Sequence, residues 1–247
     1  MERADNLTVV ILTKNEEKNI VDVVRNAAQV ADDVLIIDSG STDKTVELAK
    51  QENARVVYRA WDNDFASQRN FAFEHTDKEW ILYLDADERL NDELVEAIKI
   101  VVNSSPRKQY SIVRKIHAFG FEYKHGIFKP DELLRMFPTN SVKWEHKVHE
   151  RPICDLPKER LAGFIKHYTY DSWQQWWDKA GHYTSIWAQD NYAKGKRTTL
   201  AACLAHSIYG FIRAYFIQLG FVDGWSGLYS SFQHSIYTMI KYLKLYE

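Results

Sequence analysis

The feature that most constrains the fold is an alternation, from Leu7 to about Asn103, of short apolar runs with segments of helical periodicity. This alternation is typical of a parallel sheet whose strands are joined by crossover helices. Between the first two apolar runs, apolar residues recur at helical spacing, so a crossover helix over Glu17–Val30 should pack one face on the sheet. The expected strands are Leu7–Leu12, Val34–Asp38, Arg55–Tyr58 and Trp80–Leu84.

The pattern changes after residue 103. Tyr110–Arg114 and Leu133–Phe137 are expected to be strands of a more irregular half. From Ser172 onward the helical period returns. One side of the helix expected there carries Trp173, Trp176, Trp177, Ala180, Thr184 and Trp187.

Composition excludes several classes of protein. The 247 residues are 45% hydrophobic, enough to bury one substantial core without disulfides or metals. The net charge of −2 does not favour a nucleic-acid partner, and any functional charge must come from local clustering. Cys154 and Cys203 match neither a disulfide framework nor a metal site, and Met1–Asn6 has no signal-peptide pattern, so the expected location is the cytosol.

Acidic residues follow the apolar run that ends at Leu84. Residues i and i+2 of an extended segment point the same way, so Asp85 and Asp87 would present two carboxylates to one spot. Hard oxygen ligands favour Mg²⁺ or Mn²⁺, which share their coordination shell with substrate phosphates. The alternative is a solvated acidic turn that precedes a helix capped by Asn91.

Two other strand ends are also polar. Asp38 ends the second apolar run and is followed by Gly40, which permits a tight turn, while Thr13–Glu17 follows the first run. In open α/β sheets the ligand crevice lies beyond the carboxyl ends of the strands. Each segment alone could be an ordinary turn with a helix cap, but three such strand ends together indicate a binding site.

Four motifs in order carry a resemblance to a known family: Thr13-Lys14-Asn15-Glu16-Glu17, Asp38-Ser39-Gly40-Ser41-Thr42-Asp43, Ala66-Ser67-Gln68-Arg69-Asn70 and Asp85-Ala86-Asp87. Over about the first 90 residues this chain resembles the family-2 glycosyltransferases with a GT-A fold. The resemblance implies an α/β, Rossmann-like sheet flanked by helices, with a C-terminal helical, aromatic-rich extension. It places a catalytic domain at 1–170, with a nucleotide-binding half at 1–103 and an acceptor half at 104–170, and a membrane-associating region at 171–247.

The resemblance also implies roles for individual residues. Glu16 and Asp38 would meet the uracil and ribose of a UDP-sugar, and Arg69 would lie near the nucleotide, the alternative being a surface cation on a helix. Asp87, Asp85 and His167 would complete a Mn²⁺ or Mg²⁺ site, although a histidine beside aromatics is more often structural. The nucleotide-sugar site implied in this way comprises Thr13, Asn15, Glu16, Asp38, Arg69, Asp85, Ala86 and Asp87.

An inverting transfer needs a carboxylate that takes the proton of the acceptor hydroxyl, which contributes on the order of 10²–10⁴ in rate. Within Trp144–Arg151, Glu150 resembles the base of the family, and His149 would be a positioning residue. The alternative for Glu150 is a surface carboxylate paired with Arg151 or Lys147. The candidates in this half are Asp131, Glu132, Glu145, Glu150, Asp155 and Glu159.

The C-terminal third is depleted of charge. Between Arg197 and Lys241 only Arg213 and Asp223 are charged, and the basic residues Lys194 and Lys196 precede this stretch. An aromatic-rich amphipathic helix with a basic flank suits the headgroup boundary of an anionic leaflet. A transmembrane span is disfavoured because the uncharged stretch 198–212 is too short, and packing on the catalytic domain or in a homo-oligomer is the other alternative. The helical spacing is carried by Leu204, Ile208, Phe211, Ile212, Tyr215 and Leu219.

The segment 220–227 resembles the tail of bacterial glycosyltransferases that build the lipopolysaccharide core. The functional hypothesis is therefore inverting transfer of a hexose, glucose from UDP-glucose, to a lipid-linked saccharide by an enzyme attached peripherally to the inner membrane. The alternatives are a polyprenyl-phosphate glycosyltransferase and a non-catalytic sugar-nucleotide- or lipid-binding module. A nucleotidyltransferase ranks last because 13–17 contains no glycine for a phosphate loop.

Overall fold

The computed structural model describes residues 4–104, 107–146 and 150–247, which form two compact units. Unit 1 comprises Met1–Arg114 and Glu132–His167, and unit 2 comprises Lys115–Asp131 and Tyr168–Glu247. The segment Lys115–Asp131, which the sequence interpretation placed in an acceptor half, therefore belongs to the same compact unit as the C-terminal helices. The functional assignment of the domains stays a prediction.

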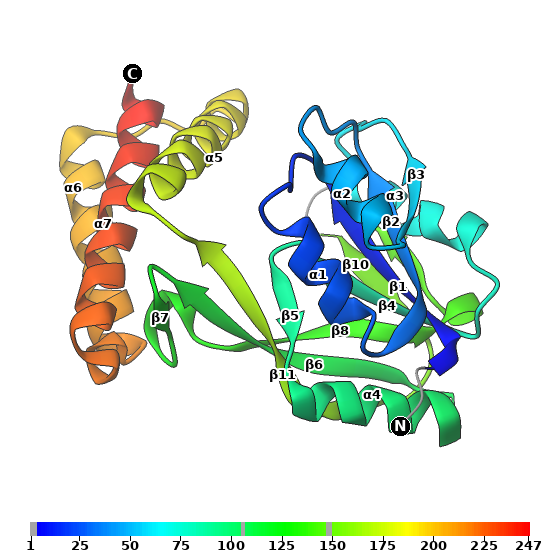
Figure 1. The fold of residues 1–247 in the computed structure, drawn as a ribbon. Helices are drawn as coiled ribbons and strands as arrows, with labels where there is room; N and C mark the ends of the chain where they lie inside the picture. The colour runs from blue at the N-terminus through cyan, green and yellow to red at the C-terminus, as the bar shows by residue number, and fades with distance from the viewer. Residues whose placement is uncertain (1–3, 105–106, 147–149) are drawn as a thin grey trace. The chain divides into compact units, whose positions relative to one another are not determined.

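The secondary structure alternates through unit 1 and becomes helical in unit 2 (Figure 1). The strands are β1 Ala4–Thr13, β2 Ala31–Asp38, β3 Arg55–Tyr58, β4 Trp80–Asp85, β5 Glu88–Leu90, β6 Gln109–Ala118, β7 Phe121–Glu122, β8 Asp131–Pro138, β9 Lys143–Glu145, β10 Arg151–Ile153 and β11 Lys158–Tyr170. The α-helices are α1 Ile20–Ala27, α2 Thr45–Gln51, α3 Phe65–Phe71, α4 Asp92–Ser104, α5 Trp173–Ala193, α6 Leu200–Ile212 and α7 Gly224–Tyr246. Shorter helical segments are η1 Ala72–His75, η2 Gly126–Phe128, η3 Thr139–Ser141, the π-helix η4 Arg213–Ile217 and η5 Gly220–Asp223.

The main sheet has the strand order β3-β2-β1-β4-β8-β6-β11-β5, with β7 paired to β6. Its first four strands are parallel, and β8 runs antiparallel to β4. Each of the four strands predicted before residue 103 is present, and both later predictions fall within β6 and β8. The GT-A expectation of an α/β sheet flanked by helices is confirmed, but the sheet is mixed rather than mostly parallel, because β8, β7 and β5 pair antiparallel with β4, β6 and β11.

Alternate side chains of the parallel strands point to opposite faces of the sheet, and helices cover both faces. Leu7, Val9 and Ile11 of β1 pack in one core cluster with residues of α1, α2 and α4. Val10 packs in the other cluster, together with residues of α3 and η1. Unit 1 is thus a three-layer sandwich whose strand ends are left open at one edge.

Local signals set the helix ends in unit 1. The first helix, α1, is shorter than the predicted Glu17–Val30, because Asn15 takes the left-handed conformation with φ of 58° and turns precede Ile20. Asn91 caps α4 as expected, since its side-chain oxygen accepts from the backbone N–H of Leu94 at 3.2 Å. The same oxygen accepts from the N–H of Phe164 at 2.8 Å, which ties the start of α4 to β11.

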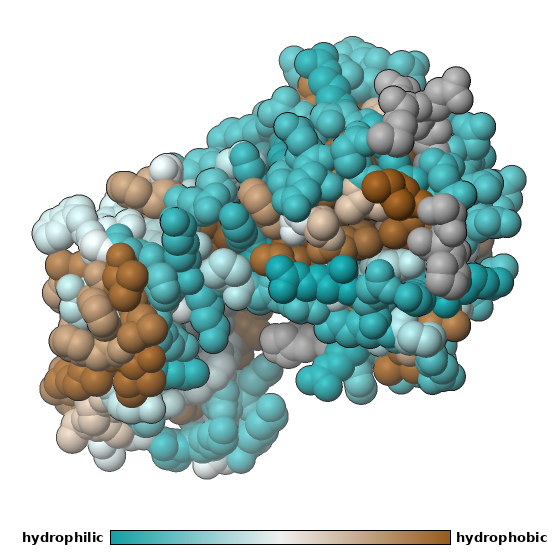
Figure 2. All heavy atoms as spheres, turned by 90° about the horizontal axis from the view of Figure 1, so that it is seen from below, coloured by the Kyte–Doolittle hydropathy of each residue, from teal (hydrophilic) through white to brown (hydrophobic). Residues whose placement is uncertain are grey.

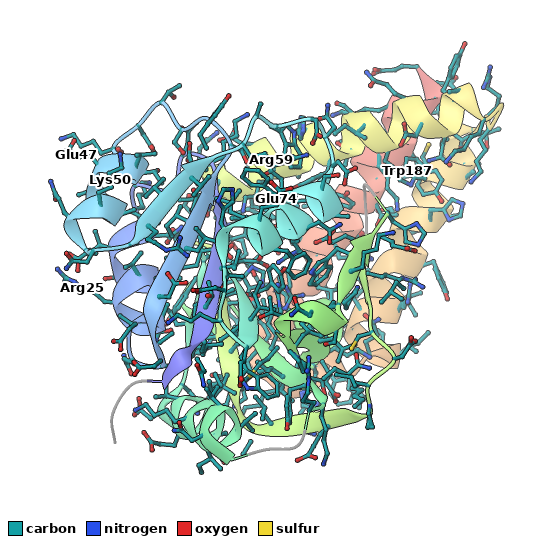
Figure 3. All side chains as sticks on the ribbon, turned by 90° about the vertical axis from the view of Figure 1, so that its right-hand side faces the viewer. Arg25, Glu47, Lys50, Arg59, Glu74 and Trp187 are labelled. Atoms are coloured by element: carbon teal, nitrogen blue, oxygen red, sulfur yellow. The ribbon has the colours of Figure 1, made fainter. Side chains whose placement is uncertain are left out.

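Unit 2 is built around α5, α6 and α7. Ser172, from which the helical period was expected to return, caps α5 by accepting from the backbone N–H of Gln175. Trp187, labelled in Figure 3, packs against Tyr242 of α7 with the two ring centroids 5.0 Å apart. The residues predicted to lie on one side of this helix differ in exposure: Trp176 is buried with Ala180 and Thr184, but Trp173 and Trp177 are exposed.

The α6 helix packs on α7 through small residues. Its buried residues are Cys203, Ser207 and Gly210, and the hydroxyl of Ser207 hydrogen-bonds that of Ser235 at 2.9 Å. Within the described residues one stretch, Leu200–Ile217, is long and apolar enough to cross a membrane by length and composition, with a mean hydropathy of 1.4 and 22% of it buried.

Candidate functional site

The ends of the parallel strands bring the acidic motifs of the sequence to one edge of unit 1. In the sheet register Thr13 lies beside Asp38, and Leu12 lies beside Asp85. Because β1 lies between β2 and β4, three motifs that are far apart in sequence converge at the carboxyl ends of adjacent strands. This is the edge at which an open α/β sheet binds ligands.

Asp38 holds the turn that follows β2. It is 4% exposed, and its two oxygens accept from the side chains of Thr13 and Ser41 and from the backbone N–H groups of Gly40 and Ser41. Gly40 has φ of 92°, a conformation that glycine adopts without strain. Asp38 therefore shapes the rim of the site, and its contact with a ribose stays a prediction.

The motif after β1 is fixed to the same turn. The backbone N–H of Asn15 donates to Ser41 Oγ at 2.8 Å, and its side-chain oxygen accepts from the N–H of Thr42 at 2.8 Å. The N–H of Glu16 donates to Thr45 Oγ1 at 2.7 Å, and its carboxylate accepts from Asn19. The two polar strand ends thus form one cross-linked wall.

A pocket of about 240 Å³ opens against this wall. Trp61 and Phe65 contribute an aromatic side, their ring centroids 4.6 Å apart in an edge-to-face arrangement. Gln68 contributes a side-chain oxygen that is buried without a hydrogen-bond partner within the described residues. The lining residues are Leu12, Thr13, Lys14, Glu16, Ser39, Trp61, Phe65 and Gln68.

The segment that carries Trp61 is held in place by polar contacts. Arg59, labelled in Figure 3, makes two hydrogen bonds to the carboxylate of Asp62, at 3.1 and 2.9 Å. The side-chain nitrogen of Gln68 donates to the carbonyl oxygens of Arg59 and Ala60. The aromatic side of the pocket is therefore anchored to α3.

Next to this pocket, Arg69 joins two acidic residues. Its guanidinium lies 3.2 Å from Asp85 and 3.3 Å from Glu150, and its carbon centre lies 4.8 Å from the ring centroid of Trp144. Arg69 is 5% exposed, so the alternative of a surface cation is wrong. The site thus brings together three residues that the sequence analysis selected.

Asp85 is shared with a second arginine. Arg135 Nη2 lies 2.7 Å from Asp85 and 2.8 Å from Glu88, whose side chain is fully buried. Burial opposes ionisation of Asp85, but the Arg135 and Arg69 guanidiniums hold the pKa of this carboxyl well below its usual range. Burial raises the pKa of Glu88, with Arg135 acting in the opposite direction. The backbone N–H of Asp85 also donates to Glu88, which fixes the strand end.

Asp87 has a different neighbour. β5 pairs with β11 in a register that places His167 opposite Glu88, and His167 Nε2 lies 3.1 Å from Asp87 Oδ2. A carboxylate and an imidazole are a donor set that suits Mn²⁺, and Mg²⁺ through the carboxylate, with the remaining positions filled by phosphate oxygens and water. Within residues 4–104, 107–146 and 150–247, the acidic, histidine and cysteine side chains form no group of three arranged to hold a metal ion.

The remaining predicted residues make backbone contacts or ion pairs with single lysines. Ala86 is buried, and its carbonyl oxygen accepts from Arg89 at 2.8 Å, which orients the backbone between the two aspartates. Of the other candidate bases, Glu132 pairs with Lys158, and surface lysines likewise face Glu145 and Glu159. His149 and Lys147 lie outside the described residues.

Sequence reasoning missed four residues of this site. Trp61 lies in the polar segment between β3 and α3, Phe65 is the first residue of α3, and neither belongs to a motif. Glu88 follows directly on the acidic motif, and Arg135 is a single charge within the apolar run Leu133–Phe137. A lone charge in a buried strand must be paired, and this signal could have identified Arg135.

Comparison with known proteins agrees with this geometry. The family model described as "Glycosyl transferase family 2" matches residues 8–137. An uncharacterized glycosyltransferase of Rickettsia typhi is 28% identical over 254 residues, covering 98% of this chain and 87% of that protein. The lipopolysaccharide core biosynthesis glycosyltransferase LpsC of Rhizobium meliloti is 25% identical over 251 residues, covering 98% and 92%.

Among solved structures, the crystal structure of S. aureus TarS aligns with a TM-score of 0.47 and 14% identity, over 66% of this chain and 37% of that one. The match of the family model extends over more than half of the chain and includes the four motifs that carry the resemblance. This chain belongs to glycosyl transferase family 2.

Proposed function

We propose that this glycosyltransferase moves a hexose, glucose from UDP-glucose, to a saccharide acceptor with inversion at the anomeric carbon. The observation that carries the proposal is the convergence of Arg69, Asp85 and Glu150 at the strand edge that also carries Asp87 and His167. Cleavage of a sugar nucleotide develops negative charge on a diphosphate, and acceptor attack releases a proton. The site offers cations for the first task and a carboxylate for the second.

The pocket beside Trp61 supports a nucleoside diphosphate as the leaving group. Its aromatic side can stack with a base, and stacking of this kind is worth about 1–3 kcal/mol per base. The side-chain oxygen of Gln68, which has no hydrogen-bond partner among the residues that the structure describes, and the carboxylate of Glu16 can accept from the N–H of a uracil ring. Uridine fits these two acceptors because its uracil ring carries one N–H donor.

A divalent cation would be held by Asp87 and His167. Bound there with the diphosphate, it would neutralise the charge that develops on the leaving group. Both oxygens of Asp85 face arginines, so its predicted part in the metal site would require Asp85 to give up one of them. The arrangement supports Asp85 as the residue that positions Arg69 and Arg135.

Glu150 is proposed as the general base. Its side chain is 20% exposed and is held toward the site by Arg69. The contact fixes the carboxylate at the same edge as the nucleotide pocket while leaving it accessible to solvent. A base in an inverting transfer needs both properties, because it must reach the hydroxyl of an incoming acceptor.

A lipid-linked saccharide, such as the inner core of lipopolysaccharide, is proposed as the acceptor, with peripheral attachment of the enzyme to the inner membrane. The relative LpsC, named for lipopolysaccharide core biosynthesis, supports the acceptor class. The charge-poor, aromatic helices of unit 2 support the attachment. The membrane-associating role of residues 171–247 is part of this proposal.

The test is release of UDP by the purified chain with Mn²⁺, a panel of UDP-hexoses and a saccharide acceptor. Glu150→Gln should lower the rate by about 10²–10⁴, whereas Glu145→Gln, a nearby carboxylate paired with Lys143 at the surface, should leave it unchanged. Asp87→Asn should weaken activation by the metal. Full activity of Glu150→Gln would refute the assignment of the base, and UDP binding without turnover on any acceptor would indicate a non-catalytic module.

A further inference from the structure

The connection between α6 and α7 in unit 2 exposes an unusual amount of apolar surface. Within ten residues, six large apolar side chains are between 46% and 79% exposed, with Trp225 the most exposed. We call this segment the apolar corner. It consists of Phe216, Ile217, Leu219, Phe221, Val222 and Trp225.

The apolar corner continues along the outer side of α6. Leu204, Ile208 and Ile212 recur every four residues, are 42% to 60% exposed, and lead directly into Phe216. Figure 2 shows hydrophobic surface gathered over the helical part of the molecule. Soluble monomers rarely expose a continuous apolar patch of this kind without a partner.

The backbone of the apolar corner is packed too tightly for these side chains to turn inward. A Cβ atom on Gly227 would lie 1.7 Å from the carbonyl oxygen of Gly220, and one on Gly220 would lie 2.7 Å from the carbonyl oxygen of Ala214. The glycines therefore allow the connection to lie directly against α7. Because backbone fills the space beneath, the large side chains must point outward.

Polar contacts within unit 2 fix the apolar corner in this conformation. Asp223 accepts from the backbone N–H groups of Lys124 and His125 at 2.9 and 2.8 Å, and from His125 Nδ1 at 2.8 Å. The N–H of Gly126 donates to the carbonyl oxygen of Gln218 at 2.8 Å. The backbone that carries the exposed side chains is therefore held in place by hydrogen bonds to Lys124, His125 and Gly126.

The charges around the apolar corner are basic. Asp223, whose side chain is 7% exposed, is the only acidic residue between 198 and 246, and it is turned toward His125. The side chains of Lys124, Lys129 and Arg213, in contrast, are exposed. Unit 2 as a whole contains ten Lys and Arg against seven Asp and Glu, a net charge of +3, although the complete chain is at −2.

We propose that the apolar corner inserts into the headgroup boundary of an anionic lipid leaflet, with Lys124, Lys129 and Arg213 binding the lipid phosphates. This inference deepens the peripheral attachment in the proposed function and rests on it for the location of the enzyme. Large apolar side chains ringed by cations are the composition that binds an anionic membrane surface. A leaflet accommodates exposed apolar side chains without a shaped pocket, whereas a second copy of the chain would need a complementary surface.

The test is flotation of the full chain with vesicles of phosphatidylcholine alone and with vesicles that also contain phosphatidylglycerol. The chain should float with the anionic vesicles, and binding should weaken as salt is added. The double variant Ile217→Ser/Trp225→Ser should bind roughly tenfold or more weakly, because two large side chains no longer enter the apolar layer. Ile100→Ser, which changes an isoleucine of unit 1 that is 57% exposed, is the matched control and should bind like the unaltered chain.

A second measurement does not depend on the stability of the double variant. Lipids brominated near the headgroup should quench tryptophan fluorescence of the unaltered chain more than that of Trp225→Phe. Equal quenching of the two proteins would place Trp225 outside the membrane and overturn the proposal. Unaltered vesicle binding by the double variant, or equal binding to both kinds of vesicle, would overturn it as well.

Two other outcomes would identify a different role. A concentration-dependent dimer that the double variant abolishes, without vesicle binding, would make the apolar corner an interface between copies. Retention in membranes after an alkaline wash would make Leu200–Ile217 a membrane span. Hydrolysis of UDP-glucose in solution should be the same for the unaltered chain and the double variant, so a failure of membrane binding is distinguishable from a failure of the proposed transfer.

Discussion

Replacing Arg135 by methionine tests the charge network at the end of β4. Arg135 is 4% exposed and holds Asp85 and Glu88 at 2.7 and 2.8 Å. Methionine keeps most of the apolar stem but leaves two carboxylates together, one of them fully buried. Breaking a buried ion pair by removing one partner costs about 3–5 kcal/mol of unfolding free energy.

The structure places the expected loss near the lower end of this range. Glu88 would retain the backbone N–H of Asp85 at 3.0 Å and the guanidinium of Arg114 at 3.6 Å. We therefore expect a loss of about 3 kcal/mol in urea unfolding followed by tryptophan fluorescence. Adding Glu88→Gln removes the buried charge and should restore about 1–3 kcal/mol of this loss.

The loss should also depend on pH. Burial already raises the pKa of Glu88, and Arg135 opposes that rise, so the pKa should increase further in Arg135→Met. A carboxyl whose pKa is higher in the folded than in the unfolded state stabilises the fold below its ordinary pKa and loses that contribution as pH rises through the folded pKa. The deficit of Arg135→Met should therefore shrink from neutral pH toward about pH 5.

The matched control is Arg25→Met. Arg25, labelled in Figure 3, makes two hydrogen bonds to Glu52. Its side chain is 66% exposed, so its loss should cost much less unfolding free energy than the loss of Arg135. Equal losses of unfolding free energy for Arg135→Met and Arg25→Met would refute the reasoning, since burial of the ion pair would then have no effect on its contribution to stability. A double variant with Glu88→Gln that is no more stable than Arg135→Met would contradict the assignment of the cost to the buried carboxylate.

Three further predictions concern the pocket, an ion pair of the sheet and a glycine of β11. Trp61→Ala should weaken UDP binding by about 1–3 kcal/mol, as measured by calorimetry. An unchanged affinity would show that the base does not bind in this pocket. The pKa of Asp33 is lowered because the hydrogen bonds from Arg55 and Thr8 outweigh the effect of burial. Asp33→Asn should therefore cost about 1 kcal/mol of unfolding free energy at neutral pH, and less as the pH falls below the ordinary carboxyl pKa. A loss that does not depend on pH in thermal unfolding would contradict this. Gly163→Ala would put a Cβ 2.3 Å from the backbone of α4 at φ of 83° and should lower the unfolding free energy by at least about 2 kcal/mol. Its control is Gly195→Ala, at φ of 78° in open space, which should cost about 1 kcal/mol. Equal losses for the two variants would show that the contact with α4 does not destabilise the fold.

The strand ends of unit 1 could be predicted because their signals are local. An apolar run that stops at a carboxylate marks both the strand and its exit, as at Asp38 and Asp85. Parallel pairing then places neighbouring exits side by side without further information, and the register of Thr13 with Asp38 is of this kind. The contact between His167 and Asp87 was expected only from the family resemblance, and the structure brings the two side chains together.

The arginine partners could not be predicted in the same way. Arg135 and Asp85 meet because β8 pairs antiparallel with β4, and nothing in either segment specifies that pairing. The aromatic side of the pocket is equally non-local, since Trp61 lies in a loop whose path depends on hydrogen bonds between Gln68 and the backbone. The pairing of charges across a sheet depends on tertiary structure, and periodicity carries no information about it.

The outer side of α6 shows what periodicity leaves open about a helix. Its apolar residues repeat at helical spacing, but the side that packs on α7 is made of small residues such as Cys203, Ser207 and Gly210. Small residues bring two helices close, and a Cβ on Gly210 would lie 3.3 Å from Thr238 Oγ1. Contact between α6 and α7 therefore buries little of the large apolar side chains, each of which would contribute about 1.5–3 kcal/mol on leaving water. The free energy of burying Leu204, Ile208 and the apolar corner is still available for binding, and a partner that covers them gains it without any rearrangement of the helices.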